Sequence, residues 1–185
     1  MKCMIHLKMG YNHSKTNLPS VSSIPALLTN VRVLFLDVNG VLNCSESEKA
    51  IEYVLLQRVA RIVETTQCKV IVSSSFRRSR SHLNYLWSRL ESVGITRAKY
   101  QLPSYIHTPD YRILERTDEI LSVILDLGAD PRYHVTHWVA IDDKDLLSQG
   151  TDAHRMRIEG HAIQTKTAVG ITEADVERAL QCLGH

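Results

Sequence analysis

Hydrophobic and polar positions follow two kinds of pattern from about residue 31 onward. In the first, nearly every residue of a short run is apolar, which predicts a strand that is buried on both faces. We expect such strands at 31–37, 69–72 and 137–141, and a smaller one around 161–164. Strands of this kind are typical of a parallel sheet covered by helices.

In the second pattern, apolar residues recur at helical spacing between the strands. The expected helices lie at 48–64, around 83–90, around 120–127 and after Thr172, where Asp175 stands in capping-box position. The stretch 95–115 is the least regular, and we expect one short strand there, near 99–102. Alternating strands and helices predict an α/β fold with a central parallel sheet.

Polar residues follow three of these strands directly. Asp37 ends the first, Ser73 follows the second, and Asp142 and Asp143 end the third. Because the carboxyl ends of parallel strands meet at one edge of a sheet, we expect these side chains along one rim. Carboxylates suit Mg²⁺, an acid beside that cation can act as a nucleophile, and hydroxyl or cationic groups can hold phosphoryl oxygens. The pattern therefore favours phosphoryl chemistry.

The order of these segments resembles the four motifs of the haloacid dehalogenase (HAD) superfamily. The matching segments are Asp37-Val38-Asn39-Gly40-Val41-Leu42, Val70-Ile71-Val72-Ser73-Ser74-Ser75, Arg116 at the start of a helix, and Val139-Ala140-Ile141-Asp142-Asp143. The phrases Ser-Ser-Ser-Phe-Arg at 73–77 and Trp-Val-Ala-Ile-Asp-Asp at 138–143 are more particularly similar to the HAD domain of multi-domain RNA-repair proteins. The resemblance covers residues 31–183 and implies a Rossmann-like three-layer fold.

The resemblance implies a role for each catalytic position. Asp37 would attack phosphorus and form an aspartyl-phosphate. Ser73 would hydrogen-bond the phosphoryl oxygens, with Ser74 as the alternative if the strand ends one residue later. Arg116 takes the place of the family's cationic residue. The alternative is that Arg116 is an ordinary solvated residue in the first turn of its helix.

The resemblance also implies a Mg²⁺ site made by Asp142 and Asp143 together with Asp37 and the main-chain carbonyl of Asn39. We assign Ser74, Arg77 and Gly40 to substrate binding.

Asn39 departs from the family pattern, which has a second Asp at this position. That Asp protonates the leaving oxygen and later deprotonates the attacking water, and an amide can do neither. We expect the metal site to survive, because it uses the main-chain carbonyl at this position. If Asn39 is an engineered change, we expect slow turnover; if it is natural, it favours a degenerate phosphatase. The alternative function is a catalytically inactive pseudophosphatase that binds phosphorylated ligands.

A second alternative is a receiver-like signalling domain, which also phosphorylates an Asp beside Mg²⁺. In such domains the acid pair precedes the phosphoacceptor along the chain, which is the reverse of the order here, so the phosphatase is favoured.

The intervals between the strands are too short for a large cap domain. In the family, an uncapped rim goes with macromolecular substrates, so we expect a phosphorylated partner such as a nucleic-acid end, a nucleotide or a phosphoprotein. Basic residues crowd the segment from Arg77 to Lys99, which suits a polyanion, although such a run is also typical of a solvated face. His134 and His137 have no further Cys or His beside them, so zinc is disfavoured.

Composition changes this picture little. The chain has 185 residues and a formal net charge of +2, which fits one domain at 31–185 and does not indicate a polyanion-binding surface overall. Its four cysteines are scattered, as in an intracellular protein of the cytoplasm or nucleus, and no apolar run predicts a membrane partner. Residues 1–30 hold lysines but no acid and read as a flexible leader, with organelle targeting as the alternative. The oligomeric state is not predicted.

Overall fold

The computed structural model describes residues 28–44, 50–110 and 115–185. Nearly all of the predicted leader, residues 1–27, lies outside the described residues. Four strands form one sheet in the order β2-β1-β3-β4, and every pairing is parallel. The strands are β1 (Thr29–Leu36), β2 (Lys69–Val72), β3 (Tyr133–Asp142) and β4 (Ala162–Gln164).

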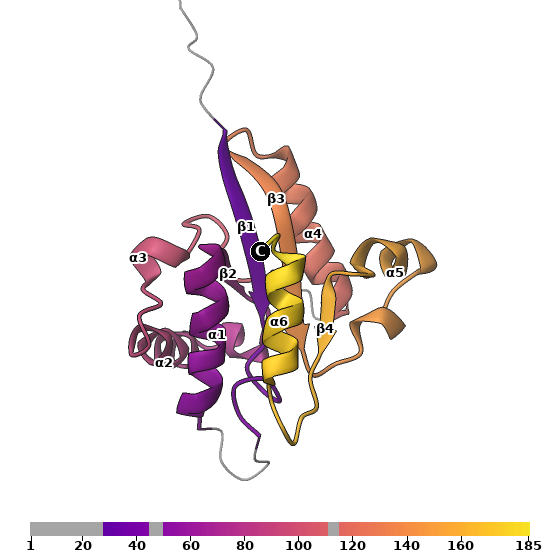
Figure 1. Ribbon diagram of the computed structural model, residues 1–185. Helices are drawn as coiled ribbons and strands as arrows, with labels where there is room; N and C mark the ends of the chain where they lie inside the picture. The colour runs from indigo at the N-terminus through magenta and orange to yellow at the C-terminus, as the bar shows by residue number, and fades with distance from the viewer. Residues whose placement is uncertain (1–27, 45–49, 111–114) are drawn as a thin grey trace, which may run out of the picture.

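Helices fill the intervals between the strands (Figure 1). They are α1 (Tyr53–Thr66), α2 (Arg80–Glu91), α3 (Arg97–Tyr100), α4 (Arg116–Ala129), α5 (Asp152–Ile158) and α6 (Glu173–Cys182), with two 3₁₀ turns, η1 (Ser75–Arg78) and η2 (Leu146–Ser148). This alternation confirms the predicted α/β, Rossmann-like fold with a central parallel sheet.

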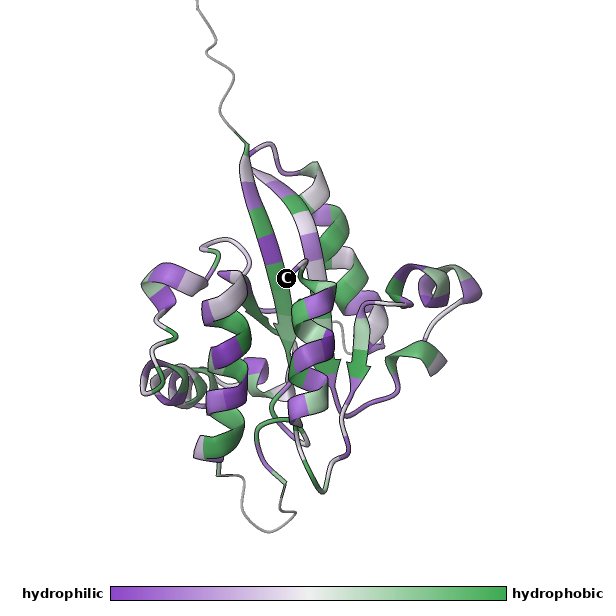
Figure 2. Cartoon of the chain, in the orientation of Figure 1, coloured by the Kyte–Doolittle hydropathy of each residue, from purple (hydrophilic) through white to green (hydrophobic). Residues whose placement is uncertain are grey.

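The sheet separates two hydrophobic layers because successive strand residues point to opposite faces. Leu34 and Leu36 of β1 pack into the layer beneath α1, α2 and α6. Val33 and Phe35 belong to the other layer, together with the apolar residues of α4. The lower half of β1 is accordingly hydrophobic throughout in Figure 2, and α1 and α6 turn polar residues outward.

Most of the expected elements are confirmed. The last helix begins as expected, since the Thr172 hydroxyl accepts the Asp175 amide and the Asp175 carboxylate accepts the Thr172 amide. The third strand starts at Tyr133, earlier than expected, because its first half alternates partly buried and exposed residues instead of being continuously apolar. Helix α4 also runs through Gly128, which was expected to end it.

The expected short strand at 99–102 is wrong. Residues Arg97–Tyr100 form the single helical turn α3, in which the amide of Gln101 donates to the carbonyl of Arg97. Tyr100 and Leu102 are buried and Lys99 is exposed, so burial does alternate as in a strand. Tyr100 is nevertheless held in the helical turn, because its backbone amide donates to the carbonyl of Thr96. Helix α5 was not expected, because Ile158 is its one buried residue and leaves no periodic signal.

The described chain contains no large cap domain, as expected. Between β1 and β2 it holds α1, and between β2 and β3 it holds η1 and the helices α2, α3 and α4. The carboxyl ends of the strands lie at the lower end of the sheet in Figure 1, and Asp37, Ser73 and Asp142 are buried there. None of the helices in the described part of the chain is both long and apolar enough to span a bilayer.

Candidate active site

Strand register brings the predicted polar residues into one row. Leu36 pairs with Val72 on one side and with Ile141 on the other, so the next residues of the three strands are neighbours. The ladders continue through them, because the Asp37 amide donates to the Ile141 carbonyl (3.0 Å) and the Ser73 amide donates to the Leu36 carbonyl (2.9 Å). Two positions before each of Asp37, Ser73 and Asp142 stands a residue of the hydrophobic layer under α4. Because strand side chains two positions apart point to the same face, all three polar side chains face that helix.

Three acids gather at this edge of the sheet. One carboxylate oxygen from each of Asp37, Asp142 and Asp143 lies within 4.8 Å of the other two. Asp142 is fully buried, and its Oδ1 accepts the Lys144 amide at 3.0 Å, while Asp143 Oδ2 accepts the Thr167 hydroxyl at 2.9 Å. A set of hard oxygen donors at this spacing fits a divalent cation such as Mg²⁺.

Gly40 makes room for the third acid. Its φ of +70° lies in the left-handed region, and a Cβ on it would fall 2.5 Å from Asp143 Oδ2. Its carbonyl accepts the Thr165 hydroxyl at 2.7 Å, which ties the turn after β1 to the chain after β4. Gly40 therefore supports the acid cluster, and its role in substrate binding stays a prediction.

Without a bound cation, burial makes it energetically costly to ionise the carboxyl groups of this cluster. Burial first, and then the charge of Asp142, raise the pKa of Asp37 to about 7, against the opposing effects of Arg116, the Ser74 hydroxyl and the Val38 amide. The pKa of Asp142 is also raised, again chiefly by burial. A bound divalent cation would supply the positive charge that favours the ionised carboxylates.

Arg116 opens α4 and faces the acids, as expected. Its Nη1 lies 3.0 Å from Asp142 Oδ2 and 3.4 Å from Asp37 Oδ1. Its Nε lies 3.5 Å from Glu119 one turn later on the helix. A guanidinium at this place can offset negative charge both on Asp37 and on a phosphoryl group beside it.

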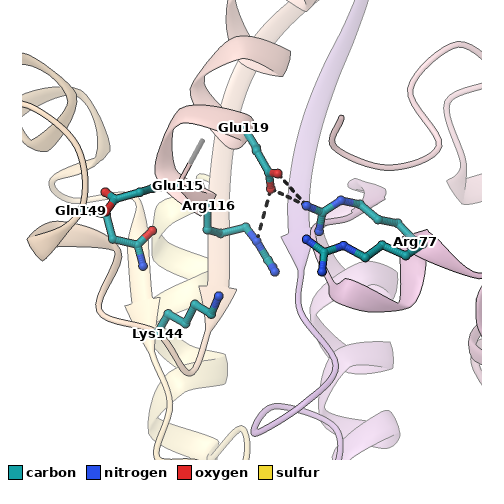
Figure 3. A pocket seen from close by; sticks show the side chains of 7 residues that line it. Arg77, Glu115, Arg116, Glu119, Lys144 and Gln149 are labelled. Carbon is teal, nitrogen blue, oxygen red and sulfur yellow. Dashed lines mark hydrogen bonds and ion pairs between the residues drawn. The ribbon is translucent and has the colours of Figure 1, made fainter. Parts of the chain in front are cut away.

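Arg77 is held in a buried ion pair. Its Nη2 donates to both carboxylate oxygens of Glu119, at 2.7 and 2.6 Å, and its Nη1 donates to the Ser74 carbonyl at 2.8 Å. Figure 3 shows Arg77 and Arg116 reaching Glu119 from two sides. The Arg77 side chain is 3% exposed, so its main contacts are with the protein itself.

The two serines after β2 occupy different places. The Ser74 hydroxyl hydrogen-bonds Asp37, lowers its pKa, and also accepts the Phe76 amide at the start of η1. The Ser73 Oγ is buried and has no hydrogen-bond partner in the described part of the chain. The Thr108 hydroxyl is also buried and without a hydrogen-bond partner among the described residues. Thr108 lies beside Ser73, because its amide donates to the Val72 carbonyl. These unpaired donors point to a missing acceptor at this edge.

Asn39 is exposed in the turn that follows β1. Its Oδ1 accepts the side-chain amide of Asn43 at 3.2 Å, and Asn43 Oδ1 in turn accepts the Gly40 amide at 3.0 Å. Because Asn39 acts here as an acceptor, an Asp could make the same hydrogen bond. The turn therefore depends on the oxygen of this residue and not on its amide nitrogen.

A cavity of about 310 Å³ adjoins the acids on the α4 side (Figure 3). We call it the cation-lined pocket; its lining residues are Arg77, Arg78, Glu115, Arg116, Glu119, Lys144 and Gln149. Sequence reasoning missed Glu119, Thr108 and Lys144. Of these three, Lys144 could have been found from the sequence, because it directly follows the acid pair. Glu119 could not, because its partner Arg77 lies 42 positions away along the chain.

Comparisons with known proteins give one match. The family model described as the HAD domain in Swiss Army Knife RNA repair proteins matches residues 33–176. Neither the curated proteins nor the solved structures contain a match. The matched range includes the second half of β1, all of β2 to β4, the three acids, both serines and Arg116. The chain belongs to the family of HAD domains found in Swiss Army Knife RNA repair proteins.

Proposed function

We propose that the protein is a Mg²⁺-dependent phosphatase that hydrolyses phosphomonoesters through an aspartyl-phosphate on Asp37. The observation that carries the proposal is the row of Asp37, Ser73 and Asp142 across three paired strands, with Asp143 and Arg116 against it. A nucleophile, a phosphate-holding hydroxyl, a cation site and a guanidinium are the groups that this reaction needs.

In the first step a carboxylate oxygen of Asp37 attacks phosphorus, and the ester P–O bond breaks. Arg116 and the hydroxyls of Ser73 or Ser74 hold the equatorial oxygens of the phosphoryl group, whose charge grows during the attack. Mg²⁺ held by Asp37, Asp142, Asp143 and the Asn39 carbonyl would neutralise part of that charge. The leaving oxygen must take up a proton.

In the second step water attacks phosphorus, Asp37 leaves as a free carboxylate and phosphate is released. Water must lose a proton for this attack. Asn39 can neither give the first proton nor take the second, and the loss of general acid–base assistance typically costs about 10²–10⁴-fold in rate. We therefore expect slow turnover and a persistent aspartyl-phosphate.

The lack of a large cap domain in the described part of the chain favours a large substrate, such as a phosphorylated nucleic-acid end. The basic segment from Arg77 to Lys99 supports this less than its composition indicates, because Arg77 is paired with Glu119 and Arg97 with Asn84 and the face of Trp87. The cation-lined pocket contributes positive charge nearer to Asp37.

The second candidate is a pseudophosphatase, which Asn39 favours. Assaying phosphomonoester hydrolysis with Mg²⁺, for this chain and for Asn39→Asp, separates the two. We expect Asn39→Asp to raise the rate by about 10²–10⁴-fold, since the Asp keeps the hydrogen bond from Asn43 and adds a titratable carboxyl. Absence of Mg²⁺-dependent hydrolysis in both proteins would overturn the phosphatase proposal.

A further inference from the structure

Most polar groups of the cation-lined pocket are engaged by other groups of the protein. Glu119 accepts Arg77 through both oxygens, and the Glu115 carboxylate accepts the Gly150 amide. Arg78 is bound by Asp110 through its Nε and Nη2. The carboxylates of the pocket wall are therefore engaged by the protein's own donors.

Lys144 and Gln149 are the exceptions. Within residues 28–44, 50–110 and 115–185, the Lys144 ammonium has no hydrogen-bond or ion-pair partner. The Oε1 of Gln149 accepts the Thr117 amide at 3.3 Å, which leaves its NH₂ group as a donor. In Figure 3 the Lys144 side chain points toward the guanidinium of Arg116. Arg116 is already paired with acids, so the positive charge left over in this space is that of Lys144, and it favours an anion there.

The position of the pocket ties this anion to the reaction centre. Arg116 lines the pocket and also contacts Asp37 and Asp142 through Nη1. Lys144 is anchored at the same point, since its amide donates to Asp142 Oδ1. An anion held by Lys144 and Gln149 would therefore lie beside the phosphoryl group on Asp37 without being the group that is transferred.

We propose that Lys144 and Gln149 bind a second, non-transferred phosphate of the substrate, so that the preferred substrate carries two neighbouring phosphates. This inference rests on the proposed function, because it places the transferred phosphate at Asp37. The shared chemistry is a phosphate dianion or diester, which a nucleoside bisphosphate or the next linkage of a nucleic-acid strand would supply. A lone phosphomonoester would leave Lys144 unpaired.

The test compares the affinities of adenosine 3′,5′-bisphosphate and of the 3′- and 5′-monophosphates, measured by titration calorimetry at equal free Mg²⁺. We expect the bisphosphate to bind about tenfold more tightly than either monophosphate, in line with a charge-assisted hydrogen bond. Lys144→Gln should reduce this ratio by about five- to tenfold. Gln149→Glu, which places a carboxylate against the anion, should reduce it as well.

Arg178→Gln is the matched control, because it removes one positive charge from α6, on the opposite face of the sheet. It should leave the ratio unchanged. Equal affinities for the bisphosphate and the monophosphates, or equal effects of Lys144→Gln and Arg178→Gln, would overturn the second phosphate site. A high ratio with no turnover in Asn39→Asp would overturn the phosphatase and keep this site, whereas turnover with equal affinities would do the reverse.

Discussion

Single residues at the turn after β1 decide whether the acids can assemble. Gly40 combines a left-handed backbone with contact against the Asp143 side chain, and the two features together favour glycine at this position. Asn39, one residue earlier, has the opposite character, because its exposed side chain makes one hydrogen bond that an Asp can also make. The turn should therefore tolerate changes at residue 39 and resist them at residue 40.

Gly40→Ala should destabilise the protein by about 1–3 kcal/mol, because the new Cβ strains the backbone and displaces Asp143. It should also weaken Mg²⁺ binding. Gly128→Ala is the control: no atom lies within 4 Å of its Cβ position inside α4, so it should stabilise the protein by about 0.5–1 kcal/mol. Urea unfolding measures both changes. Equal effects of the two substitutions would contradict the role given to Gly40.

Strand-end residues were predictable because an apolar run stops at each of them. The choice between Ser73 and Ser74 was not, since it depends on how the chain turns into η1 after β2. Ser73 continues the row of Asp37 and Asp142, whereas Ser74 hydrogen-bonds Asp37.

Helix α4 acts as the element that sets the cationic side of the site. It delivers Arg116 to the acids and Glu119 to Arg77, and Arg77 in turn holds the Ser74 carbonyl. The loop after β2 and the start of α4 are thus clamped together by one buried ion pair. Sequence reasoning proposed Arg77 as a substrate contact, because nothing in the local pattern reveals a partner on another helix.

Glu119→Gln tests this clamp. It leaves the buried Arg77 guanidinium with only the more distant Asp110 carboxylate, 3.6 Å from Nη2, as a counter-charge, which should cost about 2–4 kcal/mol of unfolding free energy. Asp126→Asn, which neutralises an exposed acid on the same helix, should change stability by less than about 0.5 kcal/mol. Chemical denaturation of both variants provides the measurement. If Glu119→Gln were as stable as Asp126→Asn, the clamp would have no energetic role.

At the scale of the whole molecule, the parallel sheet concentrates three acids at one edge, so folding and cation binding are coupled. The fold was predictable because strands and helices have different apolar periods. The coupling between folding and cation binding was not predictable, because it arises from the burial of Asp37 and Asp142 next to one another. That arrangement is set by the register of β1 against β3.

The stability of the protein should depend on pH in a way that Mg²⁺ reverses. Asp37 has a pKa of about 7 in the folded protein against 3.8 as its ordinary value. Between these values the folded state binds more protons than the unfolded state, so metal-free stability should fall as pH rises from about 4 to about 7. Cation binding needs the ionised carboxylates, so the stabilisation by Mg²⁺ should grow over the same range.

Thermal unfolding with and without Mg²⁺, at about pH 5.5 and about pH 8, checks this coupling. The Mg²⁺-induced rise in melting temperature should be larger at the higher pH, and Asp37→Asn should lose most of the pH dependence. A rise that is equal at both pH values, or larger at the lower one, would contradict the coupling.

The central claim is that Asp37 becomes phosphorylated by a phosphomonoester. Incubation of the unaltered chain with Mg²⁺ and p-nitrophenyl phosphate, followed by acid quench and peptide mass spectrometry, tests it most directly. This leaving group needs little protonation, and Asn39 cannot activate the water that would remove the phosphoryl group, so the intermediate should accumulate. We predict one phosphoryl group on Asp37 that is absent without Mg²⁺ and in Asp37→Asn. An unmodified Asp37 in both this chain and Asn39→Asp would contradict the account.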